Sequence, residues 1–191
     1  DAGATPLFTT INTQWAPKSR YPQQQAYTQQ KLTYLELMTK LLDKGADPNV
    51  RLKKHLWYMS YTFDLLSIDA RAATPFWRAA YATDVDAMKL LVANGADPKI
   101  ASLKGPDRRR GGRGGAAGAP AAGAPARTDP SGLPPVPEGG PAVFPIHAAS
   151  GVGYGEGYAA NAHRHVPGGF LPAVKYLVEE LGADVNARDH N

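Results

Sequence analysis

Apolar residues recur at helical spacing in two separate stretches of the chain. The first places apolar side chains at i, i+3 and i+4 as Met38, Leu41 and Leu42, and the second repeats this spacing as Met88, Leu91 and Val92. One apolar stripe of this kind is typical of an amphipathic helix that packs on a core. Gly45 and Gly95 follow the stripes, where a helix end favours a residue that adopts the left-handed conformation. The pattern predicts two similar helices, each ending at its glycine.

The stripes belong to a longer repetition, in which an opening and a closing phrase alternate. The closing phrase is LLDKGADPNV at 41–50, LLVANGADPKI at 90–100 and YLVEELGADVNA at 176–187, and the opening phrase is TPLFTTI at 5–11, TPFWRAA at 74–80 and FPIHAAS at 144–150. Proline after threonine fits the first turn of a helix, because its missing N–H costs nothing there and threonine is a good N-cap. The paired alanines that follow in two copies are small enough for close helix contact. The repetition predicts units that each contain two helices.

These phrases resemble the ankyrin repeat, a unit of about 33 residues with a Thr-Pro-Leu-His motif, a β-turn and two helices. The separation between Thr74 and Gly95 matches that of the family without a gap. The resemblance implies an all-α ankyrin-repeat solenoid, in which finger loops connect helix-turn-helix units. It implies structural roles for the residues that match the motif, which are Thr5, Pro6, Gly45, Asp47, Thr74, Pro75, Gly95, Asp97, Pro145, His147, Gly182 and Asp184.

The chain departs from the family pattern at a few positions. Phe144 replaces the motif threonine of the third repeat, Phe8 and Trp77 replace the motif histidine, and Lys99 replaces the usual asparagine of the closing phrase. The third repeat also carries one additional residue before Gly182. The resemblance implies that the ring of His147 ties its turn to neighbouring backbone.

We expect a single domain over 1–191 that is enlarged by insertions. Its parts are repeat 1 at about 1–50 with an insertion at 12–30, an inter-repeat insertion at 51–73, repeat 2 at about 74–102, a low-complexity finger-loop insertion at 103–141, and repeat 3 at about 142–188 with an insertion at 151–170. The sequence at each end of the chain resembles the start or end of a further repeat. We therefore expect neighbouring repeats, a partner domain or self-association.

Insertions in repeat proteins form loops that often lie on the binding face, so they hold the candidate partner contacts. The insertion at 12–30 is polar, and we expect a surface loop that its aromatic residues, Trp15 among them, hold down. The insertion at 51–73 is too apolar to lie in water, so either it packs on the neighbouring finger or its aromatic residues form an anchor for a partner. The candidate contacts are Trp57, Tyr58, Tyr61, Trp77, Arg108, Arg109, Arg110, Arg113, Tyr154 and Tyr158.

Charge is concentrated in one place. The chain has a formal net charge of +4, and part of it comes from the run DRRRGGRGG at 107–115. This run lies inside the finger-loop insertion, so both its ends are attached to repeats, and the Ala-Gly-Pro sequence after it is suited to spanning without packing. We interpret it as a basic lip that attracts acidic partners, with RNA or single-stranded nucleic acid as the alternative ligand. Removal of 105–140 is expected to leave stability nearly unchanged.

The remaining chemistry of the sequence is sparse. The chain has no cysteine, no apolar run of membrane-spanning length, and no Gly-x-Ser-x-Gly, dinucleotide-binding or P-loop motif. The histidines His147, His163 and His165 are only a weak signal for a metal site. Ser150, His147 and Asp184 have the residue types of a catalytic triad, but no sequence motif supports one. The sequence leaves the compartment unknown, with a slight lean to an exported protein. We expect no catalysis, cofactor or metal, and a module that binds another protein or scaffolds it, with end-to-end self-assembly as a further alternative.

Overall fold

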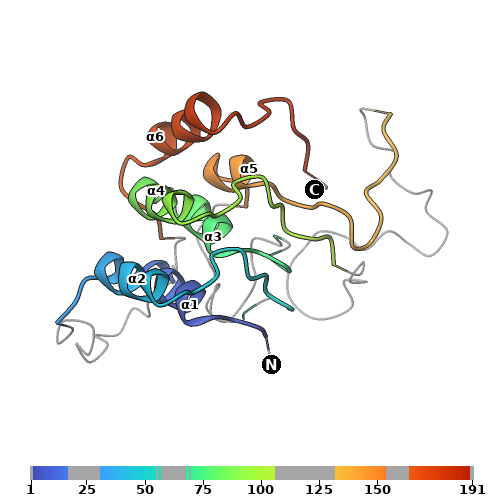
Figure 1. Cartoon of the computed structure of the whole chain (residues 1–191). Helices are drawn as coiled ribbons and strands as arrows, with labels where there is room; N and C mark the ends of the chain where they lie inside the picture. The colour runs from blue at the N-terminus through green and yellow to red at the C-terminus, as the bar shows by residue number, and fades with distance from the viewer. Residues whose placement is uncertain are drawn as a thin grey trace, which may run out of the picture.

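The computed structural model describes residues 2–16, 31–54, 56, 68, 70–105, 132–153 and 164–189. Its elements are α1 (Pro6–Trp15), α2 (Tyr34–Asp43), α3 (Pro75–Tyr81), α4 (Val85–Ala93), α5 (Pro145–Ala149), α6 (Phe170–Lys175) and a π-helical turn, η3 (Tyr176–Glu180), that continues α6 (Figure 1). Within the described residues there is no β-strand, only an isolated bridge between Leu103 and Pro141. The all-α class is thereby confirmed for this part of the chain, in which no helix is long and apolar enough to cross a membrane.

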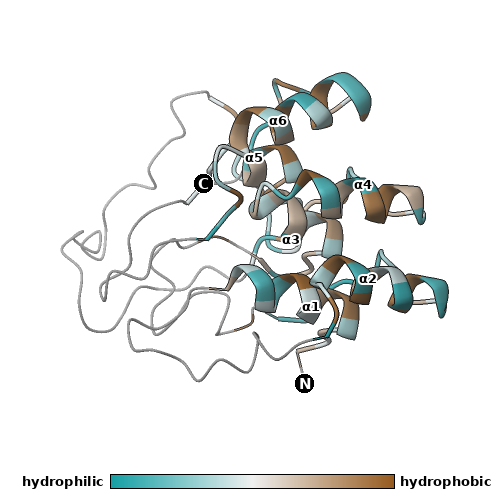
Figure 2. Cartoon of the chain, turned by 90° about the vertical axis from the view of Figure 1, so that its left-hand side faces the viewer, coloured by the Kyte–Doolittle hydropathy of each residue, from teal (hydrophilic) through white to brown (hydrophobic). Residues whose placement is uncertain are grey.

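The helices form three pairs, which we call the first unit (α1 and α2), the second unit (α3 and α4) and the third unit (α5 with α6 and η3). Figure 2 shows the pairs one above another, with the second unit between the other two. The first helix of each pair starts at an opening phrase. Thr5 and Thr74 cap α1 and α3 by accepting hydrogen bonds from the backbone N–H groups of Phe8, at 3.2 Å, and Trp77, at 3.1 Å. Phe144 has no hydroxyl group, so α5 lacks this side-chain cap.

Each second helix ends in the same way at its glycine. Gly45, Gly95 and Gly182 have φ values of 86°, 87° and 65°, which a residue with a Cβ adopts only at a cost. The residues after the glycines then form identical turns, because the carboxylate of the following aspartate accepts a backbone N–H two positions later at 2.8 Å. These bonds run from Asn49 to Asp47, from Lys99 to Asp97 and from Asn186 to Asp184.

The additional residue of the third unit is accommodated inside its second helix. In the first two units the N–H after the glycine bonds to a carbonyl five positions back, from Ala46 to Leu41 and from Ala96 to Leu91. In the third unit the same bond spans six positions, from Ala183 to Leu177 at 2.8 Å. The helix widens into η3 at this point, which is the usual structural result of a one-residue insertion in a helix.

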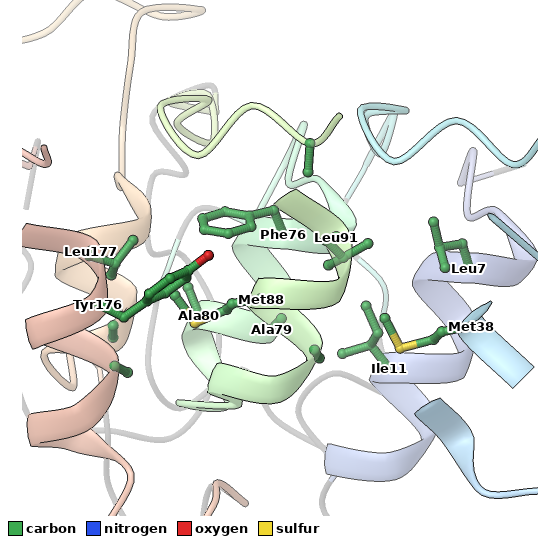
Figure 3. Packing of buried hydrophobic residues seen from close by; sticks show 14 of the residues in the cluster. Leu7, Ile11, Met38, Phe76, Ala79, Ala80, Met88, Leu91, Tyr176 and Leu177 are labelled. Atoms are coloured by element: carbon green, nitrogen blue, oxygen red, sulfur yellow. The ribbon is translucent and has the colours of Figure 1, made fainter. Parts of the chain in front are cut away.

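The core runs along the stack on both sides of its first helices. Figure 3 shows the cluster between the first and second helices, which joins all three units through Leu7, Ile11, Met38, Phe76, Met88, Leu91, Tyr176 and Leu177. A second cluster on the opposite side contains Phe8, Trp77, Tyr81 and Ala148 together with Leu52, Leu56 and Ile68. The alanines of the opening phrases, Ala79, Ala80, Ala148 and Ala149, have no exposed surface. These small side chains let α1, α3 and α5 lie next to one another in that order.

Extended segments between the units pair with their neighbours along the second cluster. Lys53 donates its backbone N–H to Ala2, Leu52 to Ala73, Leu103 to Arg71 and Ala142 to Ser102, over 2.8–3.1 Å. We call the segments 51–54, 70–74 and 99–105 the finger segments. Their backbone hydrogen bonds link one unit to the next, so the finger segments are part of the stack.

The structure shows helical or hydrogen-bonded residues inside the predicted boundaries of the insertions. Helix α1 continues to Trp15, so residues 12–15 are helical and do not belong to a loop. At the finger-loop insertion, Lys104 donates its N–H to Gly140 and accepts one from Gly139, so the end of the expected 105–140 loop is paired with its beginning. Before α6, the N–H of Val166 bonds to the carbonyl of Ala82, which attaches this segment to the second unit.

Candidate interaction surface

A buried carboxylate joins the first unit to the second. Asp84 caps α4 by accepting the N–H of Ala87 at 3.1 Å, and its other oxygen accepts the Trp15 indole N–H and the Tyr34 hydroxyl, each at 2.8 Å. Burial, and then the Asp84 charge, raise the pKa of Tyr34 above its ordinary value. Trp15 therefore holds the end of α1 in place, and both oxygens of Asp84 are committed to structure.

A second polar contact links the first helices of these units. Arg78 is almost fully buried, and its Nε donates to Oδ1 of Asn12 at 2.8 Å. Its guanidinium carbon also lies 5.8 Å from the centre of the Tyr81 ring. A buried arginine is costly unless it is hydrogen-bonded, so this contact ties α3 to α1 in one register. Sequence reasoning singled out neither Arg78 nor Asp84, although an aspartate directly before an apolar helical run is a signal for an N-cap.

Trp77 was expected at the surface as a partner contact, and the structure corrects this. Its side chain is fully buried, and its indole N–H donates to the carbonyl of Val143 at 2.9 Å. A side chain with no exposed surface cannot contact a partner. Trp77 instead packs in the second core cluster and fastens the second unit to the segment that leads into the third.

His147 occupies the same place in the third unit and makes a similar tie. Its Nδ1 accepts the N–H of Phe144 at 3.2 Å, so its Nε2 carries the proton and donates to the carbonyl of Ala187 at 2.9 Å. Both nitrogens are thus used by backbone, as the family resemblance implies. Neither is left to ligate a metal or to act as a general base.

Two further groups of the candidate catalytic set, the side chains of Ser150 and Asp184, make local hydrogen bonds. Ser150 donates its hydroxyl to Ile146 at 2.8 Å, and Asp184 accepts the N–H of Asn186, so these residues do not form a relay with His147. The His165 ring lies tilted by 56° against the Phe170 ring, with 4.8 Å between the ring centres, and His163 lies outside the described residues. Within the ranges that the structure describes, no three His, Asp or Glu side chains gather where they could hold an ion.

The finger segments carry only positive charge. Their charged side chains are Arg51, Lys53, Lys54, Arg71, Lys99 and Lys104. Arg51 fastens two finger segments together by donating to the carbonyls of Ala72 and Ala101, and Lys104 donates to Val136 at 2.9 Å. Lys54 and Lys99 are exposed. A row of like charges along one edge creates a field that attracts acidic molecules.

The remaining predicted contacts lie outside the described residues. They are Trp57, Tyr58 and Tyr61 of the 51–73 insertion, Arg108, Arg109, Arg110 and Arg113 of the basic run, and Tyr154 and Tyr158 of the third-unit insertion. Parts of the 51–73 insertion can be placed, because Leu52, Leu56 and Ile68 are buried beside Trp77. This insertion is thus attached to the second core cluster at both ends.

No protein-family model, curated protein or solved structure matches the chain significantly. The relationship among its own three units is therefore the basis for any functional argument.

Proposed function

We propose that this chain is an ankyrin-type repeat domain that binds another protein through its finger segments and the insertions that emerge from them, without catalysis. The observation that carries the proposal is the repetition of one set of contacts in each unit. Each has a first helix that starts at an opening phrase, a left-handed glycine and an aspartate turn with the same 2.8 Å bond. A stack built this way is rigid, so it loses little conformational entropy when it binds.

Charge and composition favour the side of the stack that the finger segments form, which we call the finger side, as the binding surface. The described charged groups of the finger segments are all basic, and the aromatic insertion at 51–73 and the arginine run both branch from these segments. Asp84, Trp77 and His147 use their polar atoms in structural hydrogen bonds, which supports recognition and not chemistry as the role. We expect the partner to be a protein with an acidic surface and an apolar patch, since basic charges accelerate the encounter and aromatic side chains anchor it.

A capture and reconstitution experiment tests this proposal. Partners are captured on the immobilised chain and identified, and the binding of each purified partner is then measured with the variant Lys54→Glu/Lys99→Glu. The matched control, Lys40→Glu/Lys44→Glu, makes the same charge change at exposed positions of α2 and the turn after it. We expect the finger variant to slow association by roughly tenfold or more at low salt, and the control to bind like the unchanged chain.

The same experiment can reject the proposal. Equal effects of the two variants on every partner would show that the finger side is not the binding surface. Binding that is abolished by nuclease, with a steep dependence on salt concentration, would assign the basic surface to nucleic acid.

A further inference from the structure

The two ends of the stack carry the two halves of one contact that already exists inside it. Between the first and second units, Asn49 bridges the turns with its side-chain amide. Its Nδ2 donates to the Gly95 carbonyl and its Oδ1 accepts the N–H of Asp97, each at 2.8 Å. The bridge therefore needs an asparagine on one unit and a glycine-aspartate turn on the next.

Both halves recur without a partner at opposite ends. Asn186 follows its aspartate at the same spacing and in the same turn as Asn49, and its amide makes no hydrogen bond in the part of the chain that the structure describes. At the other end, the Gly45 carbonyl and the Asp47 N–H are the groups that match those of Gly95 and Asp97. They too make no hydrogen bond there.

The two ends of the stack also carry exposed apolar side chains. At the third unit, Leu171 is 70% and Val185 66% exposed. We match the second helices by the residue that accepts the closing helix bond, which is Leu41, Leu91 or Leu177, and the turns after them by their glycine, which is Gly45, Gly95 or Gly182. Leu171 then corresponds to Leu35 and Val85, and Val185 to Pro48 and Pro98; all four of these counterparts are buried or half-buried. Positions that the next unit covers are thus left open on the third unit.

The outer face of the first unit has a complementary exposed position. Leu37 is 41% exposed, whereas its counterparts in the other units, Ala87 and Ala173, have no exposed surface. This position is thus covered in the second and third units and exposed in the first. Among the described residues, the second unit, which lies between the other two, contributes none of the large exposed apolar side chains.

From these matched positions we infer that copies of this chain associate head to tail, the third unit of one copy docking on the first unit of the next. Leu171, Val185 and Asn186 form one side of this contact, and Leu37, Gly45 and Asp47 form the other. Leu37 is larger than the alanines at its matched positions, so the two ends approach less closely than neighbouring units do. The association is weak and reversible, and because it is heterologous it produces open chains of increasing length. It uses the ends of the stack and does not depend on the proposed partner binding at the finger side.

Sedimentation of designed variants tests this inference. The unchanged chain, from about 1 μM to about 1 mM, is expected to show an average mass that rises past the dimer without a plateau. The variant Leu171→Asp/Val185→Asp blocks one end and Leu37→Asp blocks the other, so each alone remains monomeric. A mixture of the two retains one intact end of each kind and forms a dimer that grows no further. Leu133→Asp, which removes a 50% exposed leucine elsewhere, is the matched control and associates like the unchanged chain.

Several outcomes would overturn the inference. These are a monomer over the whole concentration range, association that the end variants do not alter, and a mixture that stays monomeric although circular dichroism shows both variants folded. A closed dimer that is lost with Leu171→Asp/Val185→Asp but kept with Leu37→Asp would mean that two third units meet each other. The finger variant Lys54→Glu/Lys99→Glu should associate normally, so failure of partner binding and failure of self-association are separate results.

Discussion

The indole N–H of Trp15 donates a hydrogen bond to Asp84 at 2.8 Å, which joins the end of α1 to the start of α4 over a sequence separation of 69 residues. Because Asp84 also caps α4 and accepts the Tyr34 hydroxyl, one carboxylate holds three elements together. Its removal should destabilise the stack more than a surface substitution does.

We expect Asp84→Ala to lower the free energy of unfolding by about 2–4 kcal/mol, through loss of the N-cap and of two side-chain hydrogen bonds. Urea denaturation measures this value. The control is Asp86→Ala in the first turn of the same helix, an exposed position where the loss should stay below about 0.5 kcal/mol. Similar losses for both variants would mean that Asp84 acts only through its charge near the helix end.

The pKa of Tyr34 predicts how stability depends on alkaline pH. Burial and the Asp84 charge raise this pKa in the folded state, so the folded protein keeps the hydroxyl neutral at a pH where the unfolded chain begins to ionise. The stabilisation is fully present below the ordinary tyrosine pKa of about 10 and is lost as the pH rises through the folded value. We expect the stability difference between the unchanged chain and Tyr34→Phe to shrink above that pH. A difference that stays constant from about pH 8 to about pH 11 would contradict this prediction.

The bridge between turns predicts opposite effects at two matched positions. Asn49 joins its turn to the next, whereas Lys99, which stands at the corresponding place in the second unit, has no acceptor group for a bridge to Asp184. We expect Asn49→Lys to cost about 1–2 kcal/mol of unfolding free energy and Lys99→Asn to stabilise the chain by up to about 1 kcal/mol. Chemical denaturation of both variants measures the signs. The same sign for both would show that the turns are held together by other contacts.

Deletion of the low-complexity insertion should be tolerated, but within narrower limits than the sequence indicates. Residues 106–131 can be replaced by a short Gly-Ser linker, whereas Val136, Gly139 and Gly140 must remain because they are hydrogen-bonded to Lys104. We expect a change in unfolding free energy of less than about 1 kcal/mol, since closing a shorter loop costs slightly less entropy. Deletion of the whole of 105–140 serves as the comparison and should destabilise more. Equal stability of the two deletions would mean that the contacts of Lys104 contribute nothing.

The parts of the fold that could be predicted from the sequence are those that depend on local signals. The stripes containing Met38 and Met88 predict α2 and α4, and both side chains are fully buried. The glycine that ends each of these helices has the left-handed φ that its position predicts. Counting the residues between the motif positions of the third repeat reveals one additional residue before Gly182. Only the structure shows that the helix accommodates it as a π-helical turn.

Contacts between units could not be predicted in the same way. The partner of Asp84 lies far away in the sequence, and nothing near Trp15 identifies it. The prediction that Trp77 contacts a partner was wrong. A large aromatic side chain suggested a surface anchor, whereas its position in the opening phrase directs the side chain into the core. The other aromatic and arginine candidates lie outside the described residues and stay predictions.

Spin-label distances test the central claim, a linear stack of three matched units, most directly. Thr39, Lys89 and Lys175 are exposed at matched positions of α2, α4 and α6, and the chain contains no cysteine, so a cysteine at each position takes one label. Adjacent helices pack 8–10 Å apart, so we expect about 10 Å for each neighbouring pair and about 20 Å for the pair at 39 and 175. A distance between 39 and 175 close to the sum of the other two supports the stack. A distance no longer than either neighbouring pair would contradict it.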